Sequence, residues 1–418
     1  MLSIFQGRLI IVRITLLMAM LMLISIGIAC IYASGNPAEV DGYARGATLW
    51  KKQVVLACVG LLAFFLLNLI DYRWLGPMSF WLYAGCLCVL AFILVCKYGN
   101  ILQSIVPNRK GACRWINIGF GGFKQQIQPS ELCKILYILA LAWYLRFRKN
   151  YRKFRGLVGP FALTILAMGL IIKEPDLGTT LLLMPILFSM LFVAGAKVKH
   201  LLIIIVIGAS VSPMLWGKLD MYQRSRISSF LLQSEKIRER VKRDTEFSEL
   251  LTGREHFSEK RWKEHSGYHL LHSKLAIASG GLTGYGFRKG PYIKYPQLPE
   301  RHNDFIFAII AHQWGLIGCM AVLLLYAVIV ACGMEIAWNN TDPFARLIAV
   351  GIITMLMVQV IVNTCMTVGL MPITGITLPL VSYGGSSLIV NIIAIGILNN
   401  IGRARPFTVA GKGFESSR

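Results

Sequence analysis

The residues of this chain best suited to chemistry are a few charged side chains that stand inside or beside long apolar runs. Glu131 and Lys134 lie three residues apart near the start of one run, and this spacing places both on one face of a helix. Asp176 follows Pro175 between two runs, and Asp304 stands where a long polar segment meets another run. Ionisable groups at membrane depth are costly, so each needs either a partner or a functional task.

These residues also have structural interpretations. Glu131 and Lys134 would neutralise each other and hold two helices together, with a substrate-binding role as the alternative. Asp176 and Asp304 both stand where a carboxylate would cap the following helix. Composition and spacing leave these alternatives open.

A second unusual feature is the uncharged segment Gly369–Ser387, which contains two prolines and four glycines between two apolar runs. Irregular apolar backbone at such a place predicts a re-entrant loop that lines a cavity. Ser386 and Ser387, with the glycines before them, would offer backbone N–H groups to an anion at a helix start. An ordinary kinked connection is the alternative.

A third feature is the glycine-dense stretch Ser279–Phe287, which leads into Leu298–Asp304 and then an apolar run. Backbone of this kind at a membrane surface usually packs closely against something.

Other catalytic patterns are missing: the sequence has no GxSxG, HExxH or Walker A motif, and its histidines show no metal-ligand spacing. The ten cysteines form no CxxC pair, which indicates neither a disulfide framework nor a zinc site.

Composition indicates the scaffold that positions these residues. Of the 418 residues, 56% are hydrophobic and 15% are charged, against about 25% charged in ordinary soluble domains. The mean hydropathy of +0.61 agrees, so we expect a polytopic membrane protein. The net charge of +23 fits basic loops beside anionic lipid. No basic patch interleaved with aromatic residues indicates nucleic acid.

Ten apolar runs approach the roughly 20 residues that a membrane-spanning helix needs. They lie near residues 10–33, 52–70, 78–96, 129–146, 157–173, 178–196, 200–216, 304–333, 344–370 and 383–402. We therefore expect an all-α fold, a single membrane domain over residues 1–418 with about ten transmembrane helices. A long extracytoplasmic loop, 217–303, would separate helices 7 and 8. It carries a charged arm at 234–264, which we expect to be helical and solvated.

The charge distribution also predicts an orientation. The loop Arg146–Arg155 holds six basic residues in ten, and short basic loops favour the cytoplasmic side. An even number of helices then places both termini in the cytoplasm. The first run lacks a small-residue cleavage site, so we expect it to be a retained helix.

Four segments, in the same order as in the family, resemble the SEDS proteins (shape, elongation, division and sporulation) of bacteria. The segments are Arg114–Gly119 with Gln128–Lys134, Glu174–Gly178, Ser279–Phe307 and Pro372–Ser387. The likeness covers nearly all of the chain except roughly 230–265.

This resemblance implies a peptidoglycan glycosyltransferase that polymerises lipid II, an undecaprenyl-pyrophosphate-linked disaccharide peptide. The family's catalytic Asp falls on Asp304, and its membrane-proximal Glu and Lys fall on Glu131 and Lys134. The transfer needs a base for the acceptor hydroxyl and positive charge near the departing pyrophosphate. Asp304 would be that base, or would hold a divalent cation, Mg²⁺ or Mn²⁺. The basic residues that would bind the pyrophosphate are Lys134, Arg114 and Arg109. Further substrate-binding candidates are Asp176, Ser279, Gly280, Gly281, Ser386 and Ser387.

The chain departs from the family pattern beside Asp304. Asn303 replaces the usual Thr, and His312 and Gln313 stand where the family has two acidic residues. We expect these changes to affect metal binding or the pKa of Asp304.

The segment Gly267–Gly281 is more similar to RodA than to FtsW proteins. The resemblance therefore implies a role in cell elongation at the outer face of the bacterial cytoplasmic membrane. It also implies partnership with a class B penicillin-binding protein, which supplies the transpeptidase. The alternatives are an FtsW-like division role, a lipid II flippase, and a catalytically impaired scaffold for a penicillin-binding protein.

Overall fold

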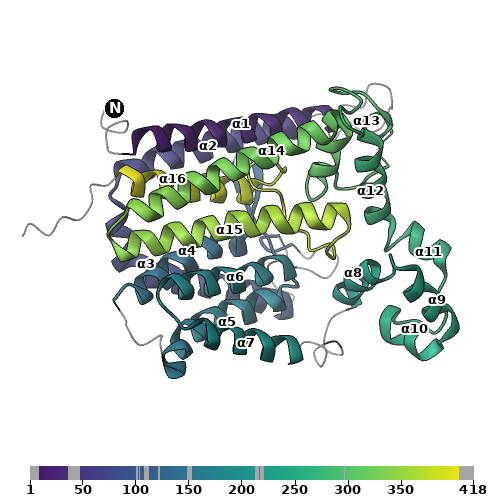
Figure 1. Cartoon of the computed structure of the whole chain (residues 1–418), viewed down its shortest axis with the longest axis horizontal. Coiled ribbons are helices and arrows are strands. Elements are labelled where there is room, and N and C mark those ends of the chain that lie inside the picture. The colour runs from purple at the N-terminus through teal and green to yellow at the C-terminus, as the bar shows by residue number, and fades with distance from the viewer. Residues whose placement is uncertain are drawn as a thin grey trace, which may run out of the picture.

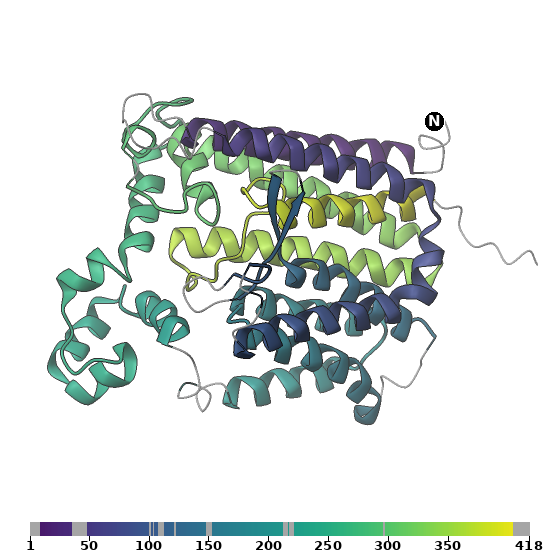
Figure 2. The same cartoon turned by 180° about the vertical axis from the view of Figure 1, so that it is seen from behind.

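The computed structural model describes residues 9–35, 48–99, 102, 104–107, 113–120, 123–147, 153–211, 216, 221–295 and 297–403. Ten helices of the described chain form a bundle, and a group of shorter helices lies at one end of it (Figures 1 and 2). The bundle helices are α1 (Ile10–Gly35), α2 (Leu49–Leu69), α3 (Leu75–Gly99), α4 (Pro129–Leu145), α5 (Val158–Lys173), α6 (Leu177–Val193), α7 (Val198–Val211), α14 (Ile306–Asn339), α15 (Pro343–Val368) and α16 (Gly385–Arg403).

A helix lies over each of the ten predicted apolar runs. Within the described part of the chain, seven helices are long and apolar enough to cross a membrane, which makes this a multi-pass membrane protein. The other three, α4, α6 and α7, have only 17, 17 and 14 residues. The exact number of spans therefore stays a prediction.

The most buried of the seven spans are α15 and α16, with 67% and 72% of their apolar windows covered by protein. They form the centre of the bundle, since α15 contacts α4, α6 and α14 and α16 contacts α1 and α2. Arg13 of α1 donates to Asn399 of α16 at 3.1 Å. The start of α1 and the end of α16 thus lie at the same end of the bundle, opposite the shorter helices (Figure 1).

A short antiparallel hairpin, which the sequence did not predict, precedes α4. Strands β1 (Ile116–Phe120) and β2 (Phe123–Ile127) pair from Ile116 opposite Ile127 to Phe120 opposite Phe123. The hairpin leads through Gln128 directly into α4 and contacts α16. It therefore helps to fix where α4 begins.

The long loop is largely helical. Its helices are α8 (Met221–Leu231), α9 (Glu235–Arg243), α10 (Thr245–Thr252), α11 (Glu259–Glu264), α12 (Tyr268–Gly280) and α13 (Pro291–Lys294). The charged arm, expected to be helical, consists of three short helices, α9 to α11, with a small apolar core that includes Val241, Leu251 and Trp262. Glu259 binds Lys242 at 2.7 Å and Lys263 at 3.0 Å across this unit.

The irregular segment between α15 and α16, which we call the re-entrant segment (residues 371–384), enters the bundle. A Cβ on Gly27, well inside α1, would meet the Val381 carbonyl oxygen at 2.4 Å. Tyr326, far along α14, donates its hydroxyl to the Pro379 carbonyl. Both contacts place this segment against two long helices, away from their ends, as a re-entrant course requires; the cavity that it was expected to line stays a prediction.

Candidate active site

Asp304 lies in the turn before α14, partly buried at the same end of the bundle as the long loop. The N-cap of α14 is Phe305, and no side chain caps this helix, so the capping interpretation of Asp304 is wrong. Burial raises the pKa of Asp304 to about 6, with Arg226 opposing the shift and Glu300 adding to it. A carboxylate of this pKa is mostly ionised at neutral pH and suited to accept a proton.

The turn that carries Asp304 is bound to the re-entrant segment. Buried Asn363 of α15 donates its side-chain amide to the carbonyls of Asp304 at 2.9 Å and Ile376 at 2.7 Å. The Ser382 hydroxyl donates to the Asn303 carbonyl at 2.7 Å. These bonds hold the turn of Asp304 against α15 and the re-entrant segment.

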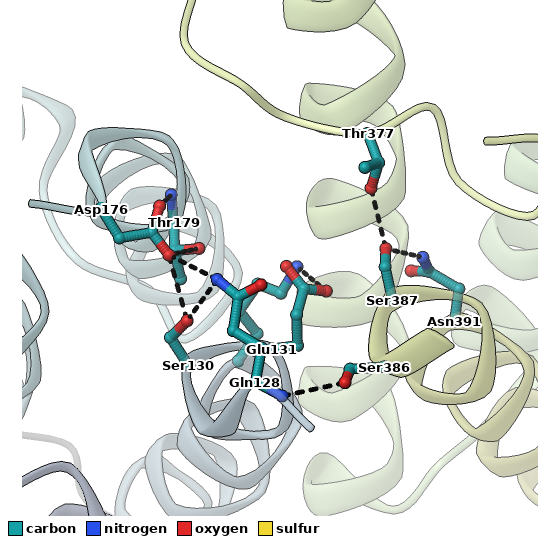
Figure 3. A network of polar contacts seen from close by, with 10 residues as sticks. Gln128, Ser130, Glu131, Asp176, Thr179, Thr377, Ser386, Ser387 and Asn391 are labelled. Carbon is teal, nitrogen blue, oxygen red and sulfur yellow. Dashed lines mark hydrogen bonds and ion pairs between the residues drawn. The ribbon is translucent and has the colours of Figure 1, made fainter. Parts of the chain in front are cut away.

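Asp176 is the centre of a second polar cluster (Figure 3). Its carboxylate accepts the backbone N–H of Thr179 at 3.2 Å, which confirms the predicted cap of α6, and the Thr179 hydroxyl at 2.8 Å. It also accepts the Ser130 hydroxyl and the Gln128 side-chain amide, both at 3.0 Å. With this many bonds, Asp176 joins α6 to the start of α4.

The same cluster contains the buried ion pair of α4. Lys134 donates to Glu131 at 2.8 Å, and their side chains are 1% and 13% exposed. Glu131 lies between Asp176 and the two serines of α16 in Figure 3. The predicted ion pair is confirmed; it lies within α4 alone, and the substrate-binding role of the two residues stays a prediction.

The two serines of α16 also belong to this neighbourhood. The Ser386 hydroxyl accepts the Gln128 backbone N–H at 2.9 Å. The Ser387 hydroxyl shares a 2.9 Å hydrogen bond with Thr377 of the re-entrant segment and accepts from Asn391 at 3.2 Å. Both hydroxyls therefore fix the helix start against its neighbours.

Arg114 and Glu174 stabilise the break between α5 and α6. Arg114 donates Nε to the Glu174 carbonyl at 2.9 Å and a terminal nitrogen to the Pro175 carbonyl. Both carboxylate oxygens of Glu174 are buried and lack a hydrogen-bond partner among the described residues. Burial, with Asp176 adding and Arg114 opposing, raises the pKa of Glu174 to about 9. Glu174 is therefore a neutral acid at pH 7, which the sequence analysis did not anticipate.

The two clusters meet at the re-entrant segment. A Cβ on Gly178, two residues after Asp176, would lie 3.2 Å from the Thr374 carbonyl oxygen and 2.7 Å from the Ile376 side chain. Asp176 and Arg114 are close enough to influence the Asp304 carboxyl electrostatically. The structure thus gathers Asp304, Asp176, Arg114 and the Glu131–Lys134 pair around one region, whereas Arg109 lies outside the described residues.

Ser279, Gly280 and Gly281 lie elsewhere, against a kink in α14. Gly315 interrupts this helix with φ +61, and the Leu316 N–H, freed there, donates to the Gly281 carbonyl at 2.9 Å. A Cβ on Gly280 would meet the Ala311 carbonyl oxygen at 1.9 Å, so only glycine fits. The binding role of these three residues stays a prediction, but their glycines serve a close backbone contact.

His312 and Gln313 belong to this same contact. The Ser279 hydroxyl donates to the Ala276 carbonyl at 2.8 Å and shares a hydrogen bond with His312 Nδ1 at 2.8 Å. The Gln313 side chain accepts the Arg288 N–H at 3.1 Å. The residues that replace the family's acidic pair therefore hold the glycine loop, and neither is among the groups that shift the pKa of Asp304.

Two residues near Asp304, Arg226 of α8 and Gly375, were not predicted from the sequence. Arg226 lies near Asp304 in space although 78 positions separate them. It is one of 12 basic residues between 217 and 266, and nothing in their spacing distinguishes it.

The sequence of this chain is similar to those of known proteins along most of its length. A family model described as "Cell cycle protein", covering FtsW, RodA and SpoVE, matches residues 14–406. A probable peptidoglycan glycosyltransferase FtsW of Geobacter metallireducens is 31% identical over 379 residues, 90% of each chain. A peptidoglycan glycosyltransferase RodA of Treponema pallidum is also 31% identical, covering 92% of this chain and 96% of its own.

The fold of this chain is also similar to that of a solved structure. One chain of a peptidoglycan synthase complex, described as coordinating polymerization and crosslinking, is 28% identical with a TM-score of 0.72. The match covers 93% of this chain and 96% of the other.

Proposed function

We propose a catalytic mechanism for this chain, which belongs to the FtsW, RodA and SpoVE family of cell cycle proteins. The SEDS resemblance is thereby confirmed, and the protein is a peptidoglycan glycosyltransferase, as its relatives are named. It polymerises lipid II, and the observation that carries the assignment of the site is the partly buried Asp304 carboxylate with its raised pKa.

In this proposal Asp304 accepts the proton of the acceptor 4-hydroxyl while that oxygen attacks the anomeric carbon of the donor. The bond from this carbon to the diphosphate breaks, and the electron pair leaves with the undecaprenyl diphosphate. The backbone bonds from Asn363 and Ser382 hold the turn, because a base acts only within hydrogen-bond reach of the proton it takes.

A divalent cation, Mg²⁺ or Mn²⁺, fits the donor set only together with the substrate. No group of three or more His, Cys, Asp or Glu side chains gathers in the described ranges. Magnesium, however, commonly binds one or two carboxylates plus substrate phosphates. Asp304 would be its protein ligand, and the ion would supply charge neutralisation at the diphosphate.

The biological setting is proposed from the relatives. The chain would act at the outer face of the bacterial cytoplasmic membrane, with both termini in the cytoplasm, beside a class B penicillin-binding protein. The neighbouring structure, a synthase complex with polymerization and crosslinking, supports such a partner. The FtsW and RodA relatives are equally similar at 31% identity, so the elongation role rests on the likeness of Gly267–Gly281 to RodA.

The experiment is polymerisation of lipid II by the purified full-length protein in detergent, with and without a class B penicillin-binding protein. We expect glycan strands. A flippase would leave lipid II unpolymerised in micelles, where there are no leaflets to exchange. A scaffold would bind the partner and also make no strands.

A further inference from the structure

A loop of the long extracytoplasmic segment is bonded along its backbone to the kink of α14. This kink loop, residues 281–290, donates N–H groups to the carbonyls of His312 at 3.1 Å and Gln313 at 2.8 Å. It accepts the N–H groups of Leu316 at 2.9 Å and Ile317 at 3.2 Å. The kink loop and the kinked turn of α14 therefore form one continuous surface.

The exposure of α14 changes at this kink. Residues 305–313 are all buried within the protein, whereas Leu316 and Ile317, directly after the kink, are 53% and 63% exposed. Glu335 is the only Asp, Glu, Lys or Arg in the sequence of α14. The stretch of about 20 residues that a membrane span needs, counted back from Glu335, begins at Gly315. The lipid-facing part of α14 thus begins at the kink, and the kink loop lies at the level of the membrane surface.

The kink loop exposes apolar and aromatic side chains at this level. Leu282, Tyr285 and Phe287 are all exposed, and so is Tyr295, which follows α13. Phe287 also stacks on Trp314 of α14, with ring centroids 6.3 Å apart. Tyrosine and tryptophan are enriched where membrane proteins meet the lipid headgroups. These side chains therefore extend the lipid-facing surface of α14.

The same part of the chain is basic. Residues 267–299 contain four Lys and Arg and no Asp or Glu. Lys289 and Lys294 are exposed, and Arg288 lies over the ring of Tyr32, 5.1 Å from its centroid. Basic side chains beside an apolar surface are attracted by anionic lipids, so the charge of this surface matches such a membrane.

From this arrangement we propose that the kink loop and α13 bind anionic phospholipid at the end of the bundle that carries the active site. Leu282, Tyr285 and Phe287 enter the boundary between headgroups and acyl chains, and Lys289 and Lys294 contact the headgroup phosphate. The occupant is a bilayer lipid, because a free phosphate ion would leave the apolar side chains in water. The inference is independent of the proposed catalytic mechanism, since it uses only α14 and the surface beside it.

The test uses the full-length protein in nanodiscs that contain equal amounts of phosphatidylcholine and phosphatidylglycerol. The photo-crosslinking residue p-benzoylphenylalanine replaces Leu282, and mass spectrometry identifies the lipids that become attached after illumination. Tyr295 is a second position for the crosslinker and covers the case in which the Leu282 variant does not fold. The matched control is Leu250, which is 58% exposed where Leu282 is 69% exposed. Leu250 belongs to α10, which lies away from the bundle helices (Figures 1 and 2).

We expect lipid adducts with the crosslinker at position 282 and none with it at position 250. Phosphatidylglycerol should exceed phosphatidylcholine in these adducts. This ratio should fall about fivefold for each lysine removed by Lys289→Gln and Lys294→Gln, the contribution of one basic residue at an anionic membrane surface. Lys260→Gln removes the same charge from an exposed position on α11 and should leave the ratio unchanged.

Two outcomes would overturn the inference. One is that lipid adducts are absent at positions 282 and 295, or are no more frequent there than at position 250. The other is an adduct composition that equals that of the nanodisc, or that stays the same when Lys289 and Lys294 are both replaced. Since neither readout needs turnover, a protein that makes no glycan strands but gives these adducts would contradict the proposed function and leave this inference standing.

Discussion

Replacing Asp304 by Asn should stabilise the protein at neutral pH while removing its activity. The pKa of Asp304 is raised from 3.8 to about 6, and each pKa unit corresponds to about 1.4 kcal/mol. The ionised carboxylate therefore costs the fold up to about 3 kcal/mol at pH 7.5. The pKa is higher in the folded state, so this cost arises as pH increases from about 4 through 6 and is about 1 kcal/mol at pH 4.5.

The assay is equilibrium unfolding by sodium dodecyl sulfate in mixed micelles at pH 7.5 and pH 4.5, for the wild type and Asp304→Asn. The variant should be more stable by up to about 3 kcal/mol at pH 7.5, and the difference should shrink to about 1 kcal/mol at pH 4.5. Glu249→Gln removes an exposed carboxylate of α10 and should change neither value appreciably. A variant that is no more stable than the wild type at pH 7.5 would refute the argument that Asp304 is held in a costly ionised state.

Three further predictions concern the same region. The kcat/KM of the wild type should fall about tenfold per pH unit below about pH 6, because Asp304 must be ionised; activity that stays level to pH 5 would exclude it as the base. Lys134→Met should destabilise the fold by about 3–5 kcal/mol by stranding Glu131, and adding Glu131→Gln should recover most of this; additive losses in unfolding measurements would contradict the pairing. Gly280→Ala should cost about 1–3 kcal/mol through its clash, whereas Gly85→Ala, which meets nothing within 4 Å, should be neutral or stabilising; equal effects would refute the close contact.

The bundle helices could be predicted because the length and apolar character that a membrane-spanning helix needs are visible in each run of the sequence. The re-entrant segment could also be predicted, since the uncharged stretch Gly369–Ser387 that contains it has two prolines and four glycines, which disfavour a continuous helix. The hairpin before α4 could not be predicted, because its two strands are short and lie outside the apolar runs. The kink at Gly315 was also missed, since a single glycine within an apolar run is compatible with a straight helix.

The site was predictable where a charge interrupts an apolar run, as at Glu131, Lys134, Asp176 and Asp304. The position of Arg226 was not predictable, because it lies in a charge-rich stretch where any basic side chain is equally expected to point into solvent. Its place beside Asp304 follows only from how α8 packs on the re-entrant segment.

Glu174 shows another limit of sequence reasoning. Its neighbours Pro175 and Asp176 indicate a helix break, but its raised pKa arises from burial that only the packed bundle creates.

The most direct test of the account is lipid II polymerisation by the wild type beside Asp304→Ala, each purified with a class B penicillin-binding protein. We expect glycan strands from the wild type and none from the variant, with partner binding equal in both. Strands of equal yield from both proteins would contradict the assignment of Asp304 as the base.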